Sequence, residues 1–359
     1  MIDDTLERPA AEPDRAPDFL RSFREPMADL NGKSILVTGG TGSFGRAFCR
    51  AVAREFTPRK LIVFSRDELK QYEMAQDFPA DRHPYMRFFI GDVRDAARLE
   101  LAMRDVDYVI HAAALKHVTV AEYNPFECVQ TNILGAQNIA TAAIRTGVKR
   151  VVALSTDKAA NPVNLYGASK LVSDKIFIAA TAMSGMDGCR FSVVRYGNVL
   201  GSRGSVIPFF RKLQQEGASV LPITDPRMTR FWITVEQGVS FVLSSLEMME
   251  GGEVFVPKIP SMNTVEIAKV VAPGLEHEVI GLRPGERLHE VMVPEDEWRT
   301  GVELEDRYVL LSATNDKLRR DYVERGAAPL PEGFCYASNR NEEQLGADDL
   351  RTLLSSTMR

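Results

Sequence analysis

Residues 33–45 read KSILVTGGTGSFG, a short apolar run that ends in a glycine-rich turn. The apolar, β-branched part of this run favours a buried strand. The next segment, RAFCRAVAREF at residues 46–56, has the apolar spacing of a helix. Gly40, Gly42 and Gly45 therefore have GxGxxG spacing between a strand and a helix, which is the context that makes this short pattern informative.

Each glycine of this loop has a physical reason to be there. Gly39 and Gly40 permit a tight turn, and Gly42 lets the backbone approach a pyrophosphate. Gly45 lets the helix pack closely on the strand, while the helix N-terminus faces the anion. A purely structural turn is the alternative, and it explains the spacing less well. The loop predicts a dinucleotide site.

The same alternation continues to about residue 200. Strands are expected at 60–65, 86–92, 106–114, 150–156 and 191–198, separated by helices at 67–78, 97–105, 128–147 and 166–183. Repeated strand–helix units predict an α/β fold with a Rossmann-like, doubly wound parallel sheet.

Three parts of the chain are expected. Residues 1–31 are rich in Pro, Asp, Glu and Arg without a clear apolar period, which predicts a loose N-terminal extension. Residues 32–200 form the nucleotide-binding body. Residues 201–359 contain glycine- and proline-rich loops and short elements, so we expect mainly a smaller substrate-binding domain and a C-terminal tail, with some segments returning to the Rossmann body.

Composition excludes several classes of protein. The 359 residues include 44 basic and 49 acidic ones, so the net charge of -5 offers no global positive field for nucleic acid or an anionic membrane. No apolar run approaches the roughly 20 residues of a membrane span, and the start lacks signal-peptide features. The four cysteines lie far apart, without disulfide or zinc spacing. We expect a soluble, cytoplasmic protein with no bound metal.

The end of the second strand indicates which dinucleotide binds. An NAD-binding protein would usually carry Asp or Glu there, but this chain has Ser65, Arg66 and Lys70. A cation and a hydroxyl suit a 2'-phosphate, which favours NADP over NAD, unless Arg66 is only a solvated surface charge. Asp67 is expected to cap the following helix. Asp92, after the third strand, either meets the adenine or caps the next helix.

A second group of polar residues follows the strand at 150–156. Ser155-Thr156-Asp157-Lys158 ends this strand, and the pair Tyr166 and Lys170 begins the next helix on one face. A lysine beside a phenol lowers its pKa from about 10, so the tyrosine can exchange a proton with a sugar hydroxyl. With the glycine loop upstream, this combination resembles the extended short-chain dehydrogenase/reductase superfamily.

The resemblance narrows to one family on several motifs. These are SRDELKQ, MRFFIGDVRD, HAAALKHVTVAEYNPFE, STDKAANPVNLYGASKL, RYGNVLGSRGSV, TDPRMTRFWIT, FVPKIPSM and RPGERLHE. Between about Lys33 and Met292 the chain is similar to the inverting UDP-N-acetylglucosamine 4,6-dehydratases of pseudaminic acid synthesis. The first 30 residues depart from the shorter start of that family.

The resemblance implies a function. It implies an NADP-dependent enzyme that dehydrates UDP-N-acetylglucosamine with inversion at C5, giving UDP-2-acetamido-2,6-dideoxy-β-L-arabino-hex-4-ulose. That product would begin pseudaminic acid synthesis for surface glycosylation, such as that of flagellin. Family members assemble as homo-oligomers, so a dimer or a hexamer is expected. The alternatives are a retaining UDP-sugar 4,6-dehydratase, a C4 epimerase or, more remotely, a non-catalytic NADP-sensing protein.

Two residues are expected to carry out the loss of water. Oxidation at C4 acidifies the C5 proton, so a base and an acid nearby would eliminate water across C5 and C6. We expect Lys158 as the base, with its pKa lowered by burial and nearby cations, and Asp157 as the acid for the C6 hydroxyl. A structural Asp–Lys ion pair is the alternative. The expected catalytic residues are Thr156, Asp157, Lys158, Tyr166 and Lys170.

The remaining site residues are expected in two groups. Cofactor contacts are expected from Gly39, Thr41, Gly42, Ser43, Phe44, Gly45, Ser65, Arg66, Lys70, Asp92, Val93, Ala112, Tyr166, Lys170 and Val199. The loops carrying Asn198, Arg203, Arg283 and Glu286 offer groups for a UDP-sugar. By resemblance, Asn198 and Arg283 bind the diphosphate or sugar, Glu286 holds the ribose and Lys116 reaches the substrate.

A few polar and aromatic residues fit structural roles. Arg195 and Arg230 are either core ion pairs or ligand contacts, and the sequence does not separate the two. His111 and His117 lack a third ligand at suitable spacing, which favours packing and local hydrogen bonds over metal binding. Trp232 is expected in the core.

Overall fold

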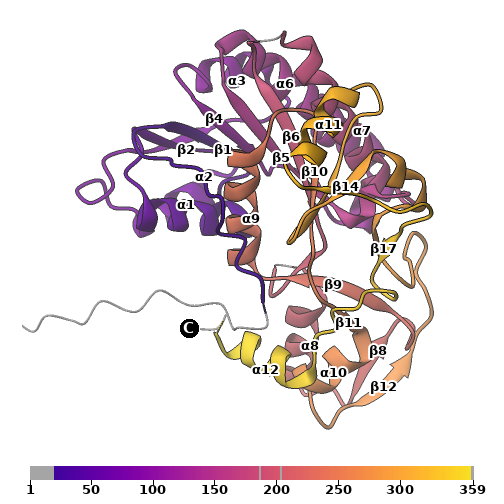
Figure 1. Ribbon diagram of the computed structural model, residues 1–359. Helices are drawn as coiled ribbons and strands as arrows, with labels where there is room; N and C mark the ends of the chain where they lie inside the picture. The colour runs from indigo at the N-terminus through magenta and orange to yellow at the C-terminus, as the bar shows by residue number, and fades with distance from the viewer. Residues whose placement is uncertain (1–19, 186, 203, 357–359) are drawn as a thin grey trace, which may run out of the picture.

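A ten-stranded sheet forms the centre of the molecule in the computed structural model, which describes residues 20–185, 187–202 and 204–356 (Figure 1). The strand order is β16-β14-β15-β10-β6-β5-β4-β1-β2-β3. The strands from β3 to β10 pair in parallel, and β15, β14 and β16 extend the sheet antiparallel. This order confirms the predicted Rossmann-like, doubly wound fold.

The strands of the main sheet are β1 (Ser34–Thr38), β2 (Lys60–Ser65), β3 (Met86–Ile90), β4 (Tyr108–His111), β5 (Arg150–Thr156), β6 (Arg190–Tyr196), β10 (Val254–Pro257), β14 (Gly301–Glu303), β15 (Arg307–Leu310) and β16 (Ala328–Pro329). The helices around it are α1 (Ser43–Glu55), α2 (Glu68–Asp77), α3 (Ala96–Ala102), α4 (Val118–Tyr123), α5 (Pro125–Cys128), α6 (Gly135–Thr146), α7 (Leu165–Met183), α9 (Val235–Met248) and α11 (Asp316–Glu324). Two short helical segments are the π-helix η1 (Val129–Leu134) and the 3-10 helix η2 (Asp157–Ala159).

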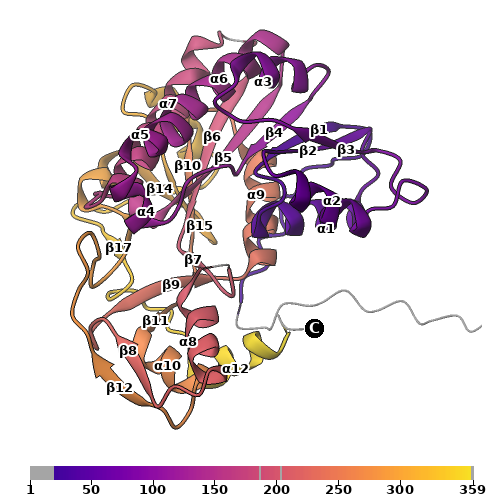
Figure 2. The same cartoon turned by 180° about the vertical axis from the view of Figure 1, so that it is seen from behind.

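Helices cover both faces of the sheet. Helix α1 packs with α9 on one face, and α3, α6 and α7 lie together on the other (Figure 2). Every residue of β1 is buried, as expected for a strand covered on both faces. The α9–β10 unit comes after residue 200 yet belongs to this body, because β10 pairs in parallel with β6.

A smaller unit below the sheet has its own apolar core. It contains β8 (Val220–Ile223), β12 (Glu276–Val279), α8 (Val206–Gln215), α10 (Thr264–Val271) and α12 (Ala347–Ser356). Its core includes Phe210, Trp232 and Leu353, which confirms the expected core position of Trp232.

Strands β7 (Asn198–Val199), β9 (Thr229–Ile233) and β11 (Ser261–Asn263) form a three-stranded sheet. Strands β13 (Val291–Val293) and β17 (Tyr336–Ala337) pair, and the 3-10 helix η3 (Glu295–Thr300) follows β13.

Residues 20–31 differ from the expectation of a loose extension. Phe23 is buried with an edge-to-face contact to Phe241 at 5.0 Å, and Leu30 is fully buried. Gln237 donates a hydrogen bond to the Arg21 carbonyl at 2.9 Å. The segment shows no apolar period because it forms neither a helix nor a strand and lies against α9 as an irregular chain.

Parallel strands bring their carboxyl ends to one edge of the sheet. The glycine loop follows β1, Ser65 ends β2 and Asp92 follows β3. Thr156 ends β5, and Asn198 begins β7 just after β6. Residues that lie far apart in the sequence therefore meet at this edge.

Candidate active site

A cavity of about 770 Å³ lies along the carboxyl ends of the parallel strands. Every residue that we expect to contact the cofactor lines this cavity, from Gly39 in the glycine loop to Val199 in β7. Lys116 lines it as well. The fold thus brings every residue that we expect to contact the cofactor to one cavity. Contact with a cofactor remains a prediction.

The glycine loop leaves room that a side chain would fill. Gly39 has φ +65°, and a Cβ there would lie 2.9 Å from the Ala113 backbone. A Cβ on Gly45 would lie 2.4 Å from Gly40 Cα, so this pair sets the close approach of α1 to the turn. Gly42 is the N-cap of α1 and supplies no side-chain cap. The cradle and the open helix N-terminus fit a dinucleotide pyrophosphate.

Polar and charged groups at the ends of β2 and β3 line the same cavity. Ser65 Oγ lies 2.8 Å from Thr41 Oγ1, and Arg66 pairs with Asp92 at 3.6 Å. Asp67 accepts a hydrogen bond from the Lys70 backbone amide at 3.0 Å, which confirms that it caps α2. Asp95, not Asp92, caps α3, so the capping alternative for Asp92 is wrong.

Tyr166 and Lys170 lie on the first turns of α7, where Asn164 caps the helix. Lys170 Nζ donates to the Leu154 carbonyl at 2.6 Å. Burial raises the pKa of Tyr166 to about 12, and the opposing field of Lys158 does not overcome it. The expected fall of this pKa below 10 is therefore wrong for the protein without ligands, because desolvation of the phenolate outweighs the neighbouring cation.

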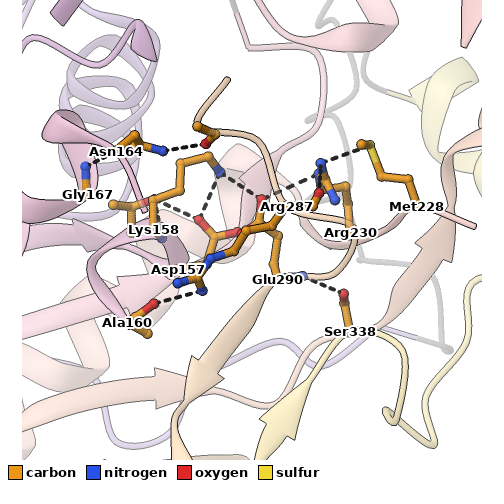
Figure 3. Close-up of polar contacts among 12 residues, drawn as sticks. Asp157, Lys158, Ala160, Asn164, Gly167, Met228, Arg230, Arg287, Glu290 and Ser338 are labelled. Atoms are coloured by element: carbon orange, nitrogen blue, oxygen red, sulfur yellow. Dashed lines mark hydrogen bonds and ion pairs between the residues drawn. The ribbon is translucent and has the colours of Figure 1, made fainter. Parts of the chain in front are cut away.

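Lys158 lies between two carboxylates (Figure 3). Its Nζ lies 3.1 Å from Asp157 Oδ1 and 3.4 Å from Glu290 Oε1. Thr156 Oγ1 donates to the same Asp157 oxygen at 2.8 Å. Burial alone would lower the pKa of Lys158, but the two carboxylates reverse this and raise it. The expected fall of this pKa is wrong, because the two carboxylates outweigh the burial on which, together with nearby cations, the expectation rested.

A second cavity of about 270 Å³ adjoins the first. Both are lined by His117, Val118, Lys158 and Asn198. Arg283 and Glu286, which we expect to contact the substrate, line the second cavity together with Arg230 and Glu290. Arg203 lies outside the described residues. Lys158 therefore lies where a cofactor cavity meets a cavity bordered by arginines.

Sequence reasoning missed Glu290 and left Arg230 undecided. Glu290 closes the motif RPGERLHE and is 2% exposed. Its place directly before the apolar run Val291–Val293 is the signal in the sequence, but only the fold shows that it faces Lys158. Arg230 borders the second cavity and its Nε lies 3.5 Å from Glu290 Oε1.

Other charged residues near the strands are structural. Arg195 is buried between Asp174 at 3.7 Å and Glu297 at 2.8 Å, so of its two alternatives the core ion pair is the correct one. His111 bonds Thr38 at 2.8 Å and packs on Phe177, as expected. Within the described residues, no group of three or more potential ligands could hold a metal ion, and no helix is long and apolar enough to cross a membrane.

Comparisons with known proteins place the chain among nucleotide-sugar enzymes. Residues 35–312 match the family model described as polysaccharide biosynthesis protein. A Campylobacter jejuni protein named UDP-N-acetylglucosamine 4,6-dehydratase (inverting) is 54% identical over 91% of this chain and 99% of its own length. A Rickettsia canadensis protein named UDP-glucose 4-epimerase is 38% identical over 90% of this chain and 95% of its own.

A solved structure extends the comparison to a bound cofactor. The dTDP-glucose 4,6-dehydratase DesIV from Streptomyces venezuelae, with NAD and TYD bound, is 26% identical with a TM-score of 0.64. The match covers 82% of this chain and 97% of that one.

Proposed function

The chain belongs to the polysaccharide biosynthesis protein family, and we propose that it is an NADP-dependent UDP-N-acetylglucosamine 4,6-dehydratase that inverts C5. One observation carries the proposal: Tyr166 and Lys158 both line the cofactor cavity, and Lys158 also lines the adjoining cavity with Arg230 and Arg283. A relative that is 54% identical over nearly its whole length is named UDP-N-acetylglucosamine 4,6-dehydratase (inverting), which supports the reaction but does not name the cofactor.

The cofactor proposal depends on the residues at the ends of β1 and β2. Bound NADP supplies the site that accepts a hydride from the sugar and returns it. Gly39, Gly42 and Gly45 leave space for its pyrophosphate. Arg66, about half exposed at the cavity wall, is available to pair with a 2'-phosphate, which supports NADP over NAD.

Tyr166 takes the proton of the C4 hydroxyl in this proposal. Its raised pKa means that the phenolate must be stabilised when the site is filled. The positive charge of Lys158 already lowers the pKa of Tyr166. Burial lowers the pKa of Lys170 itself. The bound oxidised nicotinamide adds a positive charge to the same cavity. Tyr166 is therefore expected to become a competent base only in the complex.

Water loss is neutral in protons, because one proton leaves C5 and one joins the departing C6 hydroxyl. Lys158 is protonated at rest and is therefore the group with a proton to give. The two carboxylates around Lys158 keep this proton in place at rest, so Lys158 must give it up before it can act as the base that the sequence suggested.

The substrate is proposed to bind in the second cavity. Arg230 and Arg283 supply cations there, and Arg is well suited to bidentate contact with a diphosphate. Asn198 lines both cavities, which suits a role at the sugar, and Glu286 remains the proposed partner of the ribose. We further propose a cytoplasmic homo-oligomer that supplies pseudaminic acid synthesis for surface glycosylation.

The test is incubation of purified protein and NADP with UDP-N-acetylglucosamine in deuterated water. A 4-keto sugar with a C6 methyl and the L-arabino configuration, formed without net NADPH, is the expected product. Retention at C5 would instead indicate a retaining dehydratase, and stoichiometric NADPH release would indicate a simple dehydrogenase.

A C4 epimerase is the second candidate, because a relative 38% identical carries the name UDP-glucose 4-epimerase. Epimerisation would keep the C6 hydroxyl and leave no methyl signal in the product spectrum. Tight NADP binding without turnover of any UDP-sugar would favour a non-catalytic sensor.

A further inference from the structure

One side chain joins the start of α7 to a turn that borders the second cavity. Asn164 immediately precedes α7 and lies two residues before Tyr166. Its Nδ2 donates a hydrogen bond to the Gly285 carbonyl at 2.9 Å. Gly285 belongs to the turn 283–287, and this turn and Asn164 both line the second cavity. The helix that carries Tyr166 and the turn are thus held by the same residue.

Asn164 uses both ends of its amide. Its Oδ1 accepts a hydrogen bond from the Gly167 backbone amide at 2.8 Å, which caps α7 (Figure 3). A backbone amide only donates and a carbonyl only accepts, so these two partners fix the orientation of the side chain. Capping alone would be served equally well by Asp or Ser. The donor that faces Gly285 is what Asn adds.

Gly285 allows the close approach to Asn164. A Cβ on Gly285 would lie 3.0 Å from the Asn164 Cβ and 3.6 Å from Val118 Cγ1. Gly285 also has φ +79°, a conformation that favours glycine. Gly281 has a similar φ of +83°, but a Cβ there would have no heavy atom of the described residues within 4 Å. The two glycines therefore share a backbone conformation and differ in their contacts.

The turn is a compact unit. The Glu286 amide donates to the Arg283 carbonyl at 3.0 Å, and the Arg283 amide donates to Glu286 Oε2 at 3.2 Å. Gly285 lies between these two residues in the chain. A contact at Gly285 consequently fixes the backbone from which the side chains of Arg283 and Glu286 extend. Those are the side chains that we propose to bind the diphosphate or sugar and the ribose.

Arg287 supplies a second attachment. Its Nη1 donates to the Ala160 carbonyl at 3.0 Å, in the segment between η2 and α7 (Figure 3). Its own carbonyl accepts a hydrogen bond from Arg230 Nη2 in β9 at 3.0 Å. The turn therefore bridges β9 and the segment that leads into α7.

We propose that Asn164 is a positioning residue that holds the turn 283–287 against the start of α7 before a nucleotide sugar binds. This inference rests on the proposed function. The bond to Gly285 places Arg283 and Glu286 at the second cavity in advance, so binding does not have to order them. Without this bond the turn is in the binding position for a smaller fraction of the time, and the apparent affinity falls by that fraction. Bound substrate then reacts as before.

The first experiment compares Asn164→Ser and Asn164→Asp with wild type. Both variants keep a good helix cap, so the thermal midpoint should stay near that of wild type. Neither keeps the donor, because Ser is too short and Asp has none when ionised. UDP affinity, measured by calorimetric titration, should fall about 3- to 10-fold, the scale of one neutral hydrogen bond. KM for UDP-N-acetylglucosamine should rise to match, with kcat within about twofold of wild type.

The matched control is Asn315→Ser. Asn315 caps α11 by accepting from the Leu318 amide at 3.1 Å, and it lines neither of the two cavities. This variant should bind UDP like wild type. A role of Asn164 in capping alone predicts wild-type UDP affinity in both Asn164→Ser and Asn164→Asp, and that result would overturn the proposal.

A double-mutant cycle tests the close approach of Gly285. Gly285→Ala should weaken UDP binding by about tenfold or more, whereas Gly281→Ala should change it by about twofold or less. In Asn164→Gly the Cβ that the new methyl group would meet is gone, and Gly is tolerated at a helix cap. Adding Gly285→Ala to that variant should therefore cost clearly less than in wild type. Equal losses in both backgrounds would contradict the contact.

A third measurement needs no ligand. Hydrogen–deuterium exchange of the peptide that covers residues 281–288 should be about 3- to 10-fold faster in Asn164→Ser than in wild type, because the turn opens more often. Asn315→Ser should exchange like wild type in this peptide. Unchanged exchange in Asn164→Ser would show that the bond does not hold the turn.

The two proposals fail in different ways. If wild type binds UDP but forms no dehydrated product, the proposed function is wrong, and the affinities and exchange rates still decide the role of Asn164. If wild type binds no UDP, the proposed substrate is wrong and the exchange rates decide that role. If wild type dehydrates the sugar and Asn164→Ser matches it in UDP affinity and in exchange, only the role of Asn164 is wrong.

Discussion

The cavity along the strand ends, proposed to bind the cofactor, and the adjoining cavity, proposed to bind the substrate, are built in different ways. The first includes the glycine loop at the end of β1, where the backbone leaves space that side chains would fill, beside charged residues such as Arg66 and Lys170. The second is bordered by charged side chains, including Arg230, Arg283 and Glu290. The glycines of this loop come from one continuous segment, whereas the charges of the second cavity come from segments up to 132 residues apart, from Lys158 to Glu290.

This difference predicts how each cavity responds to mutation. A backbone cradle is disturbed mainly by adding atoms. A cluster of paired charges is disturbed by removing a single member, because its partners are left buried and unpaired. The two kinds of variant should therefore separate cofactor binding from chemistry.

Lys158→Ala should have the largest effect. Water loss from the substrate should fall by about 1,000-fold or more, because the expected base for the C5 proton and the partner of two carboxylates are both lost. NADP affinity should stay near that of wild type, since the glycine loop is untouched. Product NMR and a cofactor titration measure the two effects. Lys258→Ala is the control, and near-normal dehydration by Lys158→Ala would contradict the proposed role.

Gly45→Ala should damage the other cavity. Its Cβ would lie 2.4 Å from Gly40 Cα, so the turn and α1 must separate. We expect NADP affinity to fall about 10- to 100-fold, with a loss of about 1–3 kcal/mol in the free energy of unfolding. Calorimetric titration and denaturant unfolding measure these effects.

Gly238→Ala is the control for this variant. A Cβ on Gly238, within α9, would make only ordinary contacts of 3.9 and 4.0 Å with Tyr196. NADP affinity in Gly45→Ala equal to that in Gly238→Ala would show that the cradle does not hold the cofactor.

Arg66→Ala should have a smaller and more selective effect. If Arg66 pairs with a 2'-phosphate, the variant should lose about tenfold or more in NADP affinity and little in NAD affinity, which is the scale of a charged hydrogen bond. The ratio of the two dissociation constants is the measurement. Arg50→Ala removes a surface arginine of α1 that pairs with Asp77, and it should leave the ratio unchanged. Equal losses for both cofactors would count against the NADP preference.

His111→Gln should reveal a still smaller effect on stability. Burial lowers the pKa of His111 to about 3, with a contribution from Lys170. In the unfolded chain its pKa is about 6.5, so below that pH the unfolded state binds a proton that the folded state excludes. Between pH 6 and pH 5 the unfolding free energy of wild type should fall by about 1 kcal/mol more than that of the variant. Denaturant unfolding at both pH values measures it, and equal slopes would contradict a neutral buried histidine.

The residues of the proposed cofactor cavity could be predicted from local sequence alone. Glycine spacing, buried strands and strand-end residues such as Ser65 and Asp92 are local features, and regular βα winding brings strand ends together in every sheet of this class. The predicted cofactor residues therefore all line one cavity. Asp67 as a helix cap follows from the same local rules.

The protonation states around α7 could not be predicted in this way. The sequence places Lys170 four residues after Tyr166, yet the raised pKa of Tyr166 depends on burial by surrounding elements. The segment 20–31 failed for a related reason, because its fit against α9 depends on a helix more than 200 residues later. Burial is a property of the whole fold.

By itself, the sequence determined the doubly wound sheet, the glycine cradle and the placement of Lys158 just after β5, because each follows from βα units whose patterns are local in the sequence. Only the tertiary structure decided the direction in which the pKa of Lys158 moves. Glu290 is 132 positions further along the chain and reaches the amine at 3.4 Å only when the segment before β13 folds over the strand ends. A pKa depends on every charge within a few ångströms, and those distances exist only after folding.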